Sequence, residues 1–385
     1  MVLLAAAVVA CGDSTAPTRG ITLSFCSGTS WAGVQNEGRD WVTIANGPDD
    51  VAVDATERLV VATITGGLSP ELAFYYLTRD QAQATFVCPG PSGAKRLSVP
   101  VTGTTGGDIH VAMASTGWII ASSGVITTPA NVTMRDLPDG PLDLVATYQA
   151  TAIVRRRLSY PDGATIPVVD FSSAEALSLQ SHTLAVEPTG LGAARWQTWL
   201  MTNGGTLAAL TLNACCAAGT IYSLPASYQE SGDLYRLLVA SGSVGNLRLV
   251  ERFYDTPSNQ TVVFGPTAST ATLTGAGSAG WLARADIPAQ PEYGSQVELI
   301  VSAPQPSTNT TTLAIRASKE YFGGTPATWS FTVPDLSGVD GFPTGWPRMP
   351  ASGGGQVTAS SARWGFSASS ARAGDEYRSA TGSNR

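Results

Sequence analysis

The chain has 385 residues, of which 43% are hydrophobic and only 13% charged, and its formal net charge is −7. This length allows two or three domains with cores of their own, and so few charges require a surface built largely of Thr, Ser, Asn, Gln and Gly, as in extracellular β proteins. The acidic balance and the scattered arginines argue against a nucleic-acid partner, because phosphate binding needs clustered cations.

The chain begins with an apolar run, MVLLAAAVVAC, and turns abruptly polar at residues 12–17. A run of this length is too short for a membrane-spanning helix, which takes roughly 20 residues, and its profile is that of an export signal. Residues 8–11, VVAC, resemble the lipobox of bacterial lipoproteins. The sequence departs from that pattern in one respect, because no Lys or Arg precedes the run.

The resemblance implies that the leader, residues 1–11, is cut before Cys11 and that Cys11 becomes the lipidated first residue. It further implies that the protein is anchored to a bacterial cell envelope, at the outer membrane or cell surface. Stable anchoring takes more than one acyl chain, and a mature lipoprotein would carry several. Residues 12–20 are then expected to be a flexible tether. The alternative is a short apolar tail that packs in a core.

A small β-sandwich is predicted over residues 21–91, where short β-type runs alternate with turn sequences. One or two turns of helix are predicted over residues 78–84. The predicted strands of this region are 21–25, 41–44, 58–64 and 72–77.

Five cysteines occur, and four remain once Cys11 is assigned to lipid. Exported proteins meet an oxidising compartment, so an even remainder favours disulfides over metal ligands. Cys26 and Cys88 bracket the first β region and are predicted to form a disulfide. The adjacent Cys215 and Cys216 leave two interpretations open, a disulfide with strained peptide geometry or two free buried thiols.

A second sandwich is predicted over residues 95–182. Period-two alternation in residues 95–101 and 109–113 indicates strands with one buried and one wet face. Residues 131–146, NVTMRDLPDGPLDLVA, indicate a strand, a Pro-Asp-Gly turn and a second strand. This hairpin resembles the strand-turn-strand of transthyretin-like or carboxypeptidase-regulatory-like sandwich domains, and the resemblance implies an Ig-like or transthyretin-like sandwich.

A larger sandwich or barrel is predicted over residues 183–368. With the two smaller sandwiches before it, the predicted fold class is all-β, with tandem antiparallel β-sandwich domains. One alternating set there is Leu234, Arg236, Leu238 and Ala240. The motif at residues 275–280 matches G-x-G-x-x-G, but Ile287-Pro288 follows too soon for the helix of a dinucleotide site, so we predict a hairpin loop. The tail, residues 369–385, lacks apolar spacing and is predicted to be disordered.

Catalytic signatures are weak, because the chain has only two histidines and no HExxH, CxxC or G-x-S-x-G pattern. We therefore predict no catalytic residue, no metal site and no cofactor. His110 is placed on the polar side of a strand and His182 in a linker. Asp136, Asp139 and Asp143 could offer oxygen ligands to calcium, but a turn needs Asp and Gly for its own backbone reasons.

Nine tryptophans in a low-charge β protein are the feature that points to binding. Sugars dock their apolar faces on flat aromatic rings, which makes Trp31, Trp41, Trp196 and Trp199 candidate glycan contacts. The competing interpretation is core packing, which Trp329 illustrates because it alternates with polar residues along its run.

The sequence favours a non-enzymatic, lipid-anchored cell-envelope protein with a structural, adhesive or display role. Its expected partners are the membrane, through Cys11, and a polysaccharide or another envelope protein. One alternative is a glycan-binding surface module that uses exposed tryptophans. Another is a secreted hydrolase with a carboxylate pair, which needs two acids at a defined separation; nothing in the sequence singles out such a pair.

Overall fold

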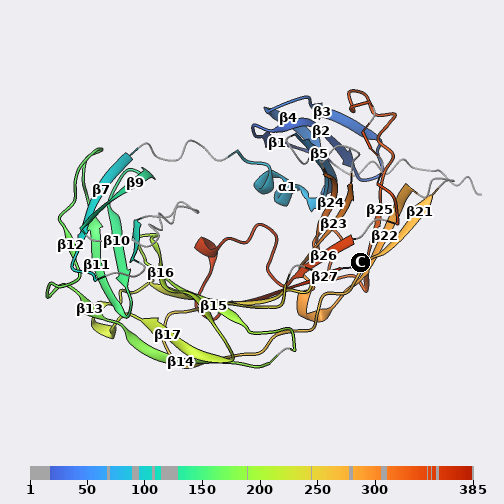
Figure 1. The fold of residues 1–385 in the computed structure, drawn as a ribbon. Helices are drawn as coiled ribbons and strands as arrows, with labels where there is room; N and C mark the ends of the chain where they lie inside the picture. Colours follow the sequence, from blue (N-terminus) through green and yellow to red (C-terminus); the bar gives the residue numbers. More distant parts are fainter. Residues whose placement is uncertain are drawn as a thin grey trace, which may run out of the picture. The chain divides into compact units, whose positions relative to one another are not determined.

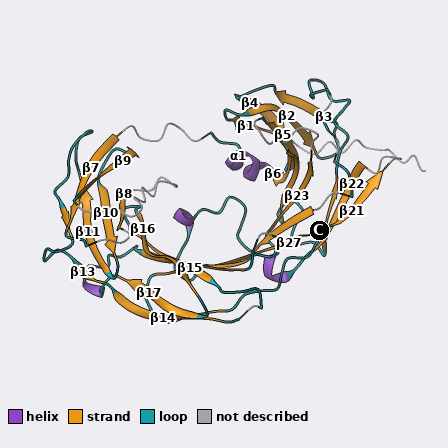
Figure 2. Cartoon of the chain, viewed as in Figure 1, coloured by secondary structure: helices purple, strands orange, loops and turns teal. Residues whose placement is uncertain are grey.

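The structure is a computed structural model of the chain. The leader, the lipobox and most of the predicted tether lie outside the described residues. Within the described part, all regular structure is β except for one short α-helix and three 3-10 turns (Figure 2), which confirms the predicted all-β fold with several sheets. The described residues are 18–66, 70–88, 95–105, 109–113, 129–188, 190–243, 245–276, 281–304, 310–344, 346–347, 349–352 and 355–383.

The chain divides into two compact units, each made of separate segments. Unit 1 comprises residues 1–88, 302–324 and 334–349, and unit 2 comprises residues 89–301, 325–333 and 350–385. The predicted third domain, residues 183–368, therefore contributes two segments to unit 1. The physical reason is strand pairing, because the strand at residues 310–318 pairs with one from the first β region.

Unit 1 confirms the β-type runs predicted near the N-terminus. Its strands follow the order β24-β6-β5-β2-β3, and β1 pairs with β4. The contact of β24 with β6 is parallel and the others are antiparallel. The elements are β1 (Arg19–Phe25), β2 (Thr29–Asn36), β3 (Trp41–Ala45), β4 (Asp49–Ala55), β5 (Arg58–Thr65), β6 (Glu71–Thr78), α1 (Arg79–Thr85) and β24 (Thr310–Ser318).

The predicted disulfide closes the small ribbon of unit 1 against its helix. Cys26 follows β1 and Cys88 follows α1, and their sulfurs are bonded with the Cα atoms 5.3 Å apart. Beside the bond, the Ser24 backbone N–H donates to the Phe86 carbonyl at 2.8 Å, and the rings of Phe25 and Phe86 lie 5.4 Å apart. Covalent, hydrogen-bond and apolar contacts thus join the same two segments.

The first sandwich of unit 2 has two facing sheets with strand orders β12-β7-β9 and β13-β11-β10-β8 (Figure 1). Its core contains Leu97, Val99 and Val101, the buried positions that the alternation of β7 predicts. The strands are β7 (Lys95–Thr102), β8 (Ile109–Met113), β9 (Ala130–Leu137), β10 (Leu142–Tyr148), β11 (Thr151–Leu158), β12 (Val169–Asp170) and β13 (Leu177–Ser178).

The predicted hairpin at residues 131–146 is wrong in one respect. Both strands form, but β9 pairs with β7 whereas β10 pairs with β8 and β11. The Pro-Asp-Gly turn therefore crosses from one sheet to the other, and the apolar faces of the two strands, with Val132 and Leu144, meet in the core.

The rest of unit 2 forms a second sandwich and a further sheet. The second sandwich packs β17-β14-β20 against β15, β18 and β19, around a core that includes Trp196, Leu237 and Val250. Its strands are β14 (Gln180–Val186), β15 (Arg195–Met201), β16 (Leu207–Cys215), β17 (Ala218–Ser223), β18 (Leu234–Ser241), β19 (Arg248–Tyr254) and β20 (Gln260–Val262), with 3-10 turn η1 (Ala226–Tyr228). His182 lies within β14, where its Nε2 is 2.9 Å from the Ser223 hydroxyl, so its predicted place in a linker is wrong.

The larger sheet of unit 2 continues beyond the second sandwich in the order β16-β15-β18-β19-β27-β26-β23, and β21-β22-β25 form a sheet of their own. In both, the strands form open sheets, which agrees with the sandwich alternative. The predicted hairpin around residues 275–280 is confirmed, because β21 and β22 pair antiparallel; residues 277–280 lie outside the described residues. These elements are β21 (Thr272–Ala276), β22 (Trp281–Pro288), β23 (Gln296–Pro304), β25 (Thr328–Thr332), β26 (Gly355–Ser360) and β27 (Glu376–Ser383), with η2 (Pro291–Tyr293) and η3 (Ala368–Ser370).

The predicted disordered tail, residues 369–385, is wrong. Its residues 376–383 form β27, which pairs antiparallel with both β19 and β26. Small residues allow this close fit: Ala380 is buried, and the Thr381 hydroxyl accepts a 2.7 Å hydrogen bond from the Leu247 backbone N–H. The sequence of β27 shows no apolar periodicity, because backbone pairing and small side chains hold this strand in place and large apolar side chains do not.

The alternating set of β18 named from the sequence, with Leu234 and Arg236, forms the partly exposed face of this strand. Tyr235, Leu237 and Val239 are the buried positions, and the face with Arg236 is partly exposed.

Within the described part of the chain, no helix is both long and apolar enough to cross a membrane.

Candidate functional site

The two sandwiches of unit 2 meet across an apolar junction. The outward side of β8, β10 and β11 supplies Ala112, Val145 and Ala152, and the second sandwich supplies Leu200, Leu210 and Tyr235, among others, to one buried cluster. Burial of the Tyr235 ring raises its pKa to about 12, and its hydroxyl accepts a 3.2 Å hydrogen bond from the Leu224 backbone N–H. The junction therefore has the character of a domain core.

A buried ionic cluster lies at one side of this junction. Arg156 of β11 donates from Nη2 to Asp233 Oδ2 at 2.6 Å and from Nη1 to Asp233 Oδ1 at 3.1 Å. The same Nη1 donates to Asp143 Oδ2, in β10, at 3.2 Å. Asp143 and Asp233 are almost completely buried, so one guanidinium joins a carboxylate of the first sandwich to a carboxylate of the second. Two-pronged guanidinium–carboxylate contacts are the strong, directional kind of ion pair.

Backbone donors complete the shell around both carboxylates. The N–H of Arg157 donates to Asp143 Oδ1 at 2.8 Å, and the N–H groups of Asn203 and Glu230 donate to Asp233 at 2.9 and 3.1 Å. Such donors make burial of the charges tolerable.

The electrostatics of Asp143 reflect two opposing effects. Burial alone would raise the pKa of its carboxyl group. The hydrogen bonds from the Arg157 N–H, the Thr202 side chain and Arg156, with the charge of Arg156, outweigh that effect and hold the pKa below its usual range. Asp143 is therefore a structural anion at neutral pH.

Two threonine hydroxyls near the Arg156 cluster donate hydrogen bonds to backbone carbonyls. Thr206 donates to the carbonyl of Asp143 at 2.8 Å, and Thr147 of β10 donates to the carbonyl of Ala209 in β16 at 2.8 Å. Gly204 is needed beside them, because a Cβ there would lie 2.6 Å from an Asp143 carboxylate oxygen. Side-chain and backbone groups of both sandwiches thus interlock over a few residues.

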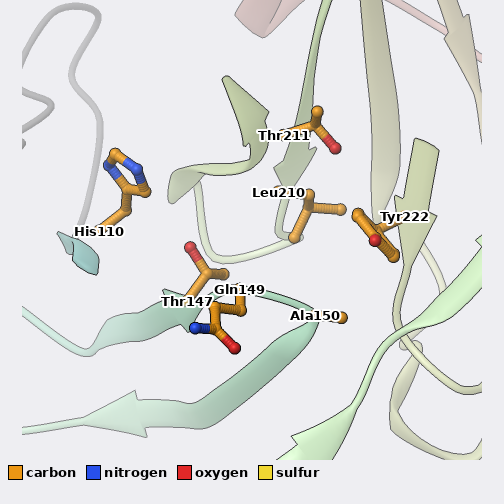
Figure 3. A pocket seen from close by; sticks show the side chains of 7 residues that line it. All are labelled: His110, Thr147, Gln149, Ala150, Leu210, Thr211 and Tyr222. Atoms are coloured by element: carbon orange, nitrogen blue, oxygen red, sulfur yellow. The ribbon is translucent and has the colours of Figure 1, made fainter. Parts of the chain in front are cut away.

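A pocket of about 430 Å³ opens at the same junction (Figure 3). Thr147 and Gln149 come from the first sandwich, as does His110 of β8, whereas Thr211 and Tyr222 come from the second. The Thr211 hydroxyl is buried with no hydrogen-bond partner among the described residues. Among the described residues, the lining is polar and contains no carboxylate, Lys or Arg. Its residues are His110, Thr147, Gln149, Ala150, Leu210, Thr211 and Tyr222.

The tryptophans named as glycan contacts do not form a surface row. Trp31 is 0%, Trp196 2% and Trp199 5% exposed. Rings so deeply buried offer no free face to a sugar, so the glycan prediction is wrong for these three and core packing holds, as it does for Trp329. Trp41 is half-buried, with its ring centroid 5.9 Å from that of Phe74.

Two of these rings are buried against glycines. A Cβ on Gly33 would lie 2.6 Å from the Trp31 ring, and a Cβ on Gly219 would collide with the Trp196 ring. Trp31 also donates from Nε1 to the Thr43 hydroxyl at 3.2 Å, and the Arg236 guanidinium stacks 4.7 Å above the Trp199 ring. Each ring therefore has a dedicated partner inside the fold.

The structure separates the acids suggested for calcium. Asp143 is held by Arg156 and by the Arg157 N–H, as described above. Asp136 and Asp139 remain on the surface side of the crossing turn. Among the described residues, no group of three or more His, Cys, Asp or Glu side chains is placed to hold a metal ion.

Sequence reasoning missed Arg156 and Asp233, the residues that lock the junction. The two are 77 positions apart, and no local pattern relates them. The available signal was the run Arg155-Arg156-Arg157 inside a β-type segment, where charges are costly unless paired. Arg155 is paired as well, with Glu175 at 2.7 Å. No family model and no curated protein matches this chain.

Proposed function

We propose that this is a lipid-anchored protein of the bacterial cell envelope whose β-sandwich body has a structural, adhesive or display role without enzymatic activity. Its membrane partner is reached through a lipidated Cys11, and its outward partner is a polysaccharide or another envelope protein. The net charge of −7 supports a partner other than nucleic acid.

The observation that carries the proposal is the Arg156 cluster between the two sandwiches of unit 2. A display module must hold its distal domains in a fixed direction. Domains that are joined only by flexible linkers do not keep such a direction. Here one guanidinium joins Asp143 and Asp233 across the junction, beside an apolar cluster shared by both sandwiches. A buried, multiply bonded contact of this kind resists hinge motion.

The acids at this junction also fit a structural role better than the hydrolase alternative. Catalytic carboxylate pairs need one group that can hold a proton and one that faces substrate. Asp143 and Asp233 face the same arginine, are buried, and are saturated with hydrogen bonds from the protein. Their ion pairs and hydrogen bonds support a role in holding the two sandwiches together.

The anchor is tested by replacing Cys11 with Ala and fractionating cells that express the tagged full chain. We expect the wild type in the membrane fraction and Cys11→Ala in the soluble fraction. Cys215→Ala, a matched replacement of a different cysteine, should stay with the membrane. Unchanged membrane retention of Cys11→Ala would sink the proposal.

A glycan-binding role remains the second candidate, now at the pocket rather than at the tryptophans. The described lining residues offer hydroxyl, amide and imidazole groups and the Tyr222 ring, and none of them is Asp, Glu, Lys or Arg. That combination suits a neutral polyhydroxylated ligand, which is recognised by hydrogen bonds and by stacking on an aromatic face.

A glycan array probed with the full chain tests this second candidate. Binding should be weakened at least tenfold by Thr211→Val and by Gln149→Ala. Tyr228→Ala, which changes an exposed tyrosine outside the pocket, should leave it unchanged. A flat array response, or equal binding by all variants, would eliminate the pocket as a glycan site.

A further inference from the structure

Two adjacent thiols stand exposed at the end of a strand in unit 2. Cys215 is the last residue of β16, and Cys216 follows it in the turn toward β17. Their sulfurs are 2.9 Å apart and both side chains are exposed. The sequence leaves two interpretations of this pair open. Because both side chains are exposed, the interpretation as free buried thiols is excluded.

The backbone holds the two residues firmly on both sides. Cys215 pairs with Arg195 of β15, and the N–H of Cys216 donates to the Ala194 carbonyl at 2.9 Å. Cys216 adopts φ +101°, a conformation usually reserved for glycine. A cysteine at a position that favours glycine points to a use for its sulfur, because residues in such conformations cluster at functional sites.

We propose that Cys215 and Cys216 form a reversible redox site, which closes to a vicinal disulfide by exchange with an oxidised thiol compound and reopens on reduction. The sulfurs need to approach by only about 0.9 Å to reach the S–S bond length. Their fixed proximity makes ring closure an intramolecular step, which is strongly favoured over attack by a second external molecule.

The exchange proceeds in two balanced steps. The Cys215 thiol loses its proton, and its thiolate attacks one sulfur of the external disulfide, forming a mixed disulfide and releasing one thiolate. The Cys216 thiol then loses its proton and attacks the Cys215 sulfur, closing the ring and releasing the second thiolate. Two electrons pass to the external disulfide, and the two protons end on the two released thiols.

The contact between the two sulfurs raises the pKa of the Cys216 thiol above its usual range. Either sulfur can be the donor in this contact, so the same two steps can also begin at Cys216. The other described cysteines, Cys26 and Cys88, are already bonded to each other. Exchange chemistry should therefore be confined to the exposed pair.

Mass spectrometry of the full chain tests the site directly. Purified protein is treated briefly with dithiothreitol, desalted, incubated with oxidised glutathione, alkylated after denaturation and digested with trypsin. Residues 196–236 contain no internal Lys or Arg and carry both cysteines, so the pair falls in one peptide. We expect this peptide to be lighter by two hydrogens and unalkylated, and to take up two alkyl groups after re-reduction.

Single variants calibrate the reaction. Cys215→Ser and Cys216→Ser each retain one thiol that cannot close a ring, so each should carry one glutathione at the concentration that fully oxidises the wild type. Three results would overturn the proposal: two glutathiones on the wild-type peptide, two alkyl groups despite full glutathionylation of the single variants, or a disulfide between two chains.

Discussion

Arg156 and Asp233 share two hydrogen bonds, 2.6 and 3.1 Å long, across the junction of two sandwiches. Neither residue belongs to a recognisable motif, and Asp143 completes the cluster from the neighbouring strand. The two buried carboxylates depend on a single guanidinium, so removal of Arg156 has different consequences from loss of an ordinary surface ion pair.

Replacement of Arg156 by Met should destabilise unit 2 by about 3 kcal/mol, because two carboxylates are then left buried without their cation. The expected measurement is a lower urea midpoint with faster proteolysis at the junction. Arg157→Ala is the control. Its side chain is largely exposed and pairs with Glu230, so its loss should cost below about 1 kcal/mol. Equal effects of the two variants would contradict the role given to Arg156.

The pH dependence of stability should reveal Asp143. Its folded-state pKa is lowered, so its contribution is fully present above the unfolded-state pKa of about 3.9 and is lost as the pH falls through the folded-state pKa. The stability difference between wild type and Asp143→Asn should therefore be constant above pH ~5 and shrink below pH ~4. Urea unfolding of both proteins over that range provides the measurement. A difference that grows in acid has the wrong sign for this account.

Gly219→Ala should disturb the ring of Trp196. The added methyl group overlaps the indole, and overpacking of this kind costs about 1–3 kcal/mol. Reducing the ring with Trp196→Phe in the same chain should recover part of the loss, which a double-mutant cycle measures. Gly20→Ala is the matched control in a strand, since the nearest atom to its new Cβ would be 3.9 Å away. Additive effects of the two core changes would show that the ring lies elsewhere.

Loss of the Cys26–Cys88 bond should destabilise unit 1. The bond joins residues separated by 62 positions, for which chain entropy gives about 4 kcal/mol. Chemical unfolding of Cys26→Ser/Cys88→Ser should show a drop of that size. Cys215→Ser/Cys216→Ser removes two exposed thiols and should change stability by less than about 0.5 kcal/mol. If the two double variants unfold alike, the bond has no such role.

Local patterns predicted the strands whose two faces differ. The alternation of Leu97, Val99 and Val101 gave the correct buried face of β7, whose other face is exposed or partly exposed. The alternation named on β18 is also real: the set with Leu234 is partly exposed, and Tyr235 lies on the buried face. β27 escaped detection because Ala380 and Gly382 supply close fit instead of apolar bulk.

Long-range relations were beyond local patterns. The turn at residues 137–141 has the composition of a hairpin, but composition does not decide whether the next strand joins the same sheet or crosses to the facing one. The same holds for the junction. Arg156 and Asp233 become partners only through packing of β11 against the second sandwich, and charge runs in sequence do not specify a distant partner.

The most direct test of the account is the N-terminus of the mature protein purified from cell membranes. Trypsin cleaves after Arg19, so the first peptide shows which residues precede the folded body. We predict a peptide of residues 11–19 whose Cys11 carries acyl chains and whose leader is gone. A peptide that still contains residues 2–10 and lacks lipid would contradict a tethered display protein.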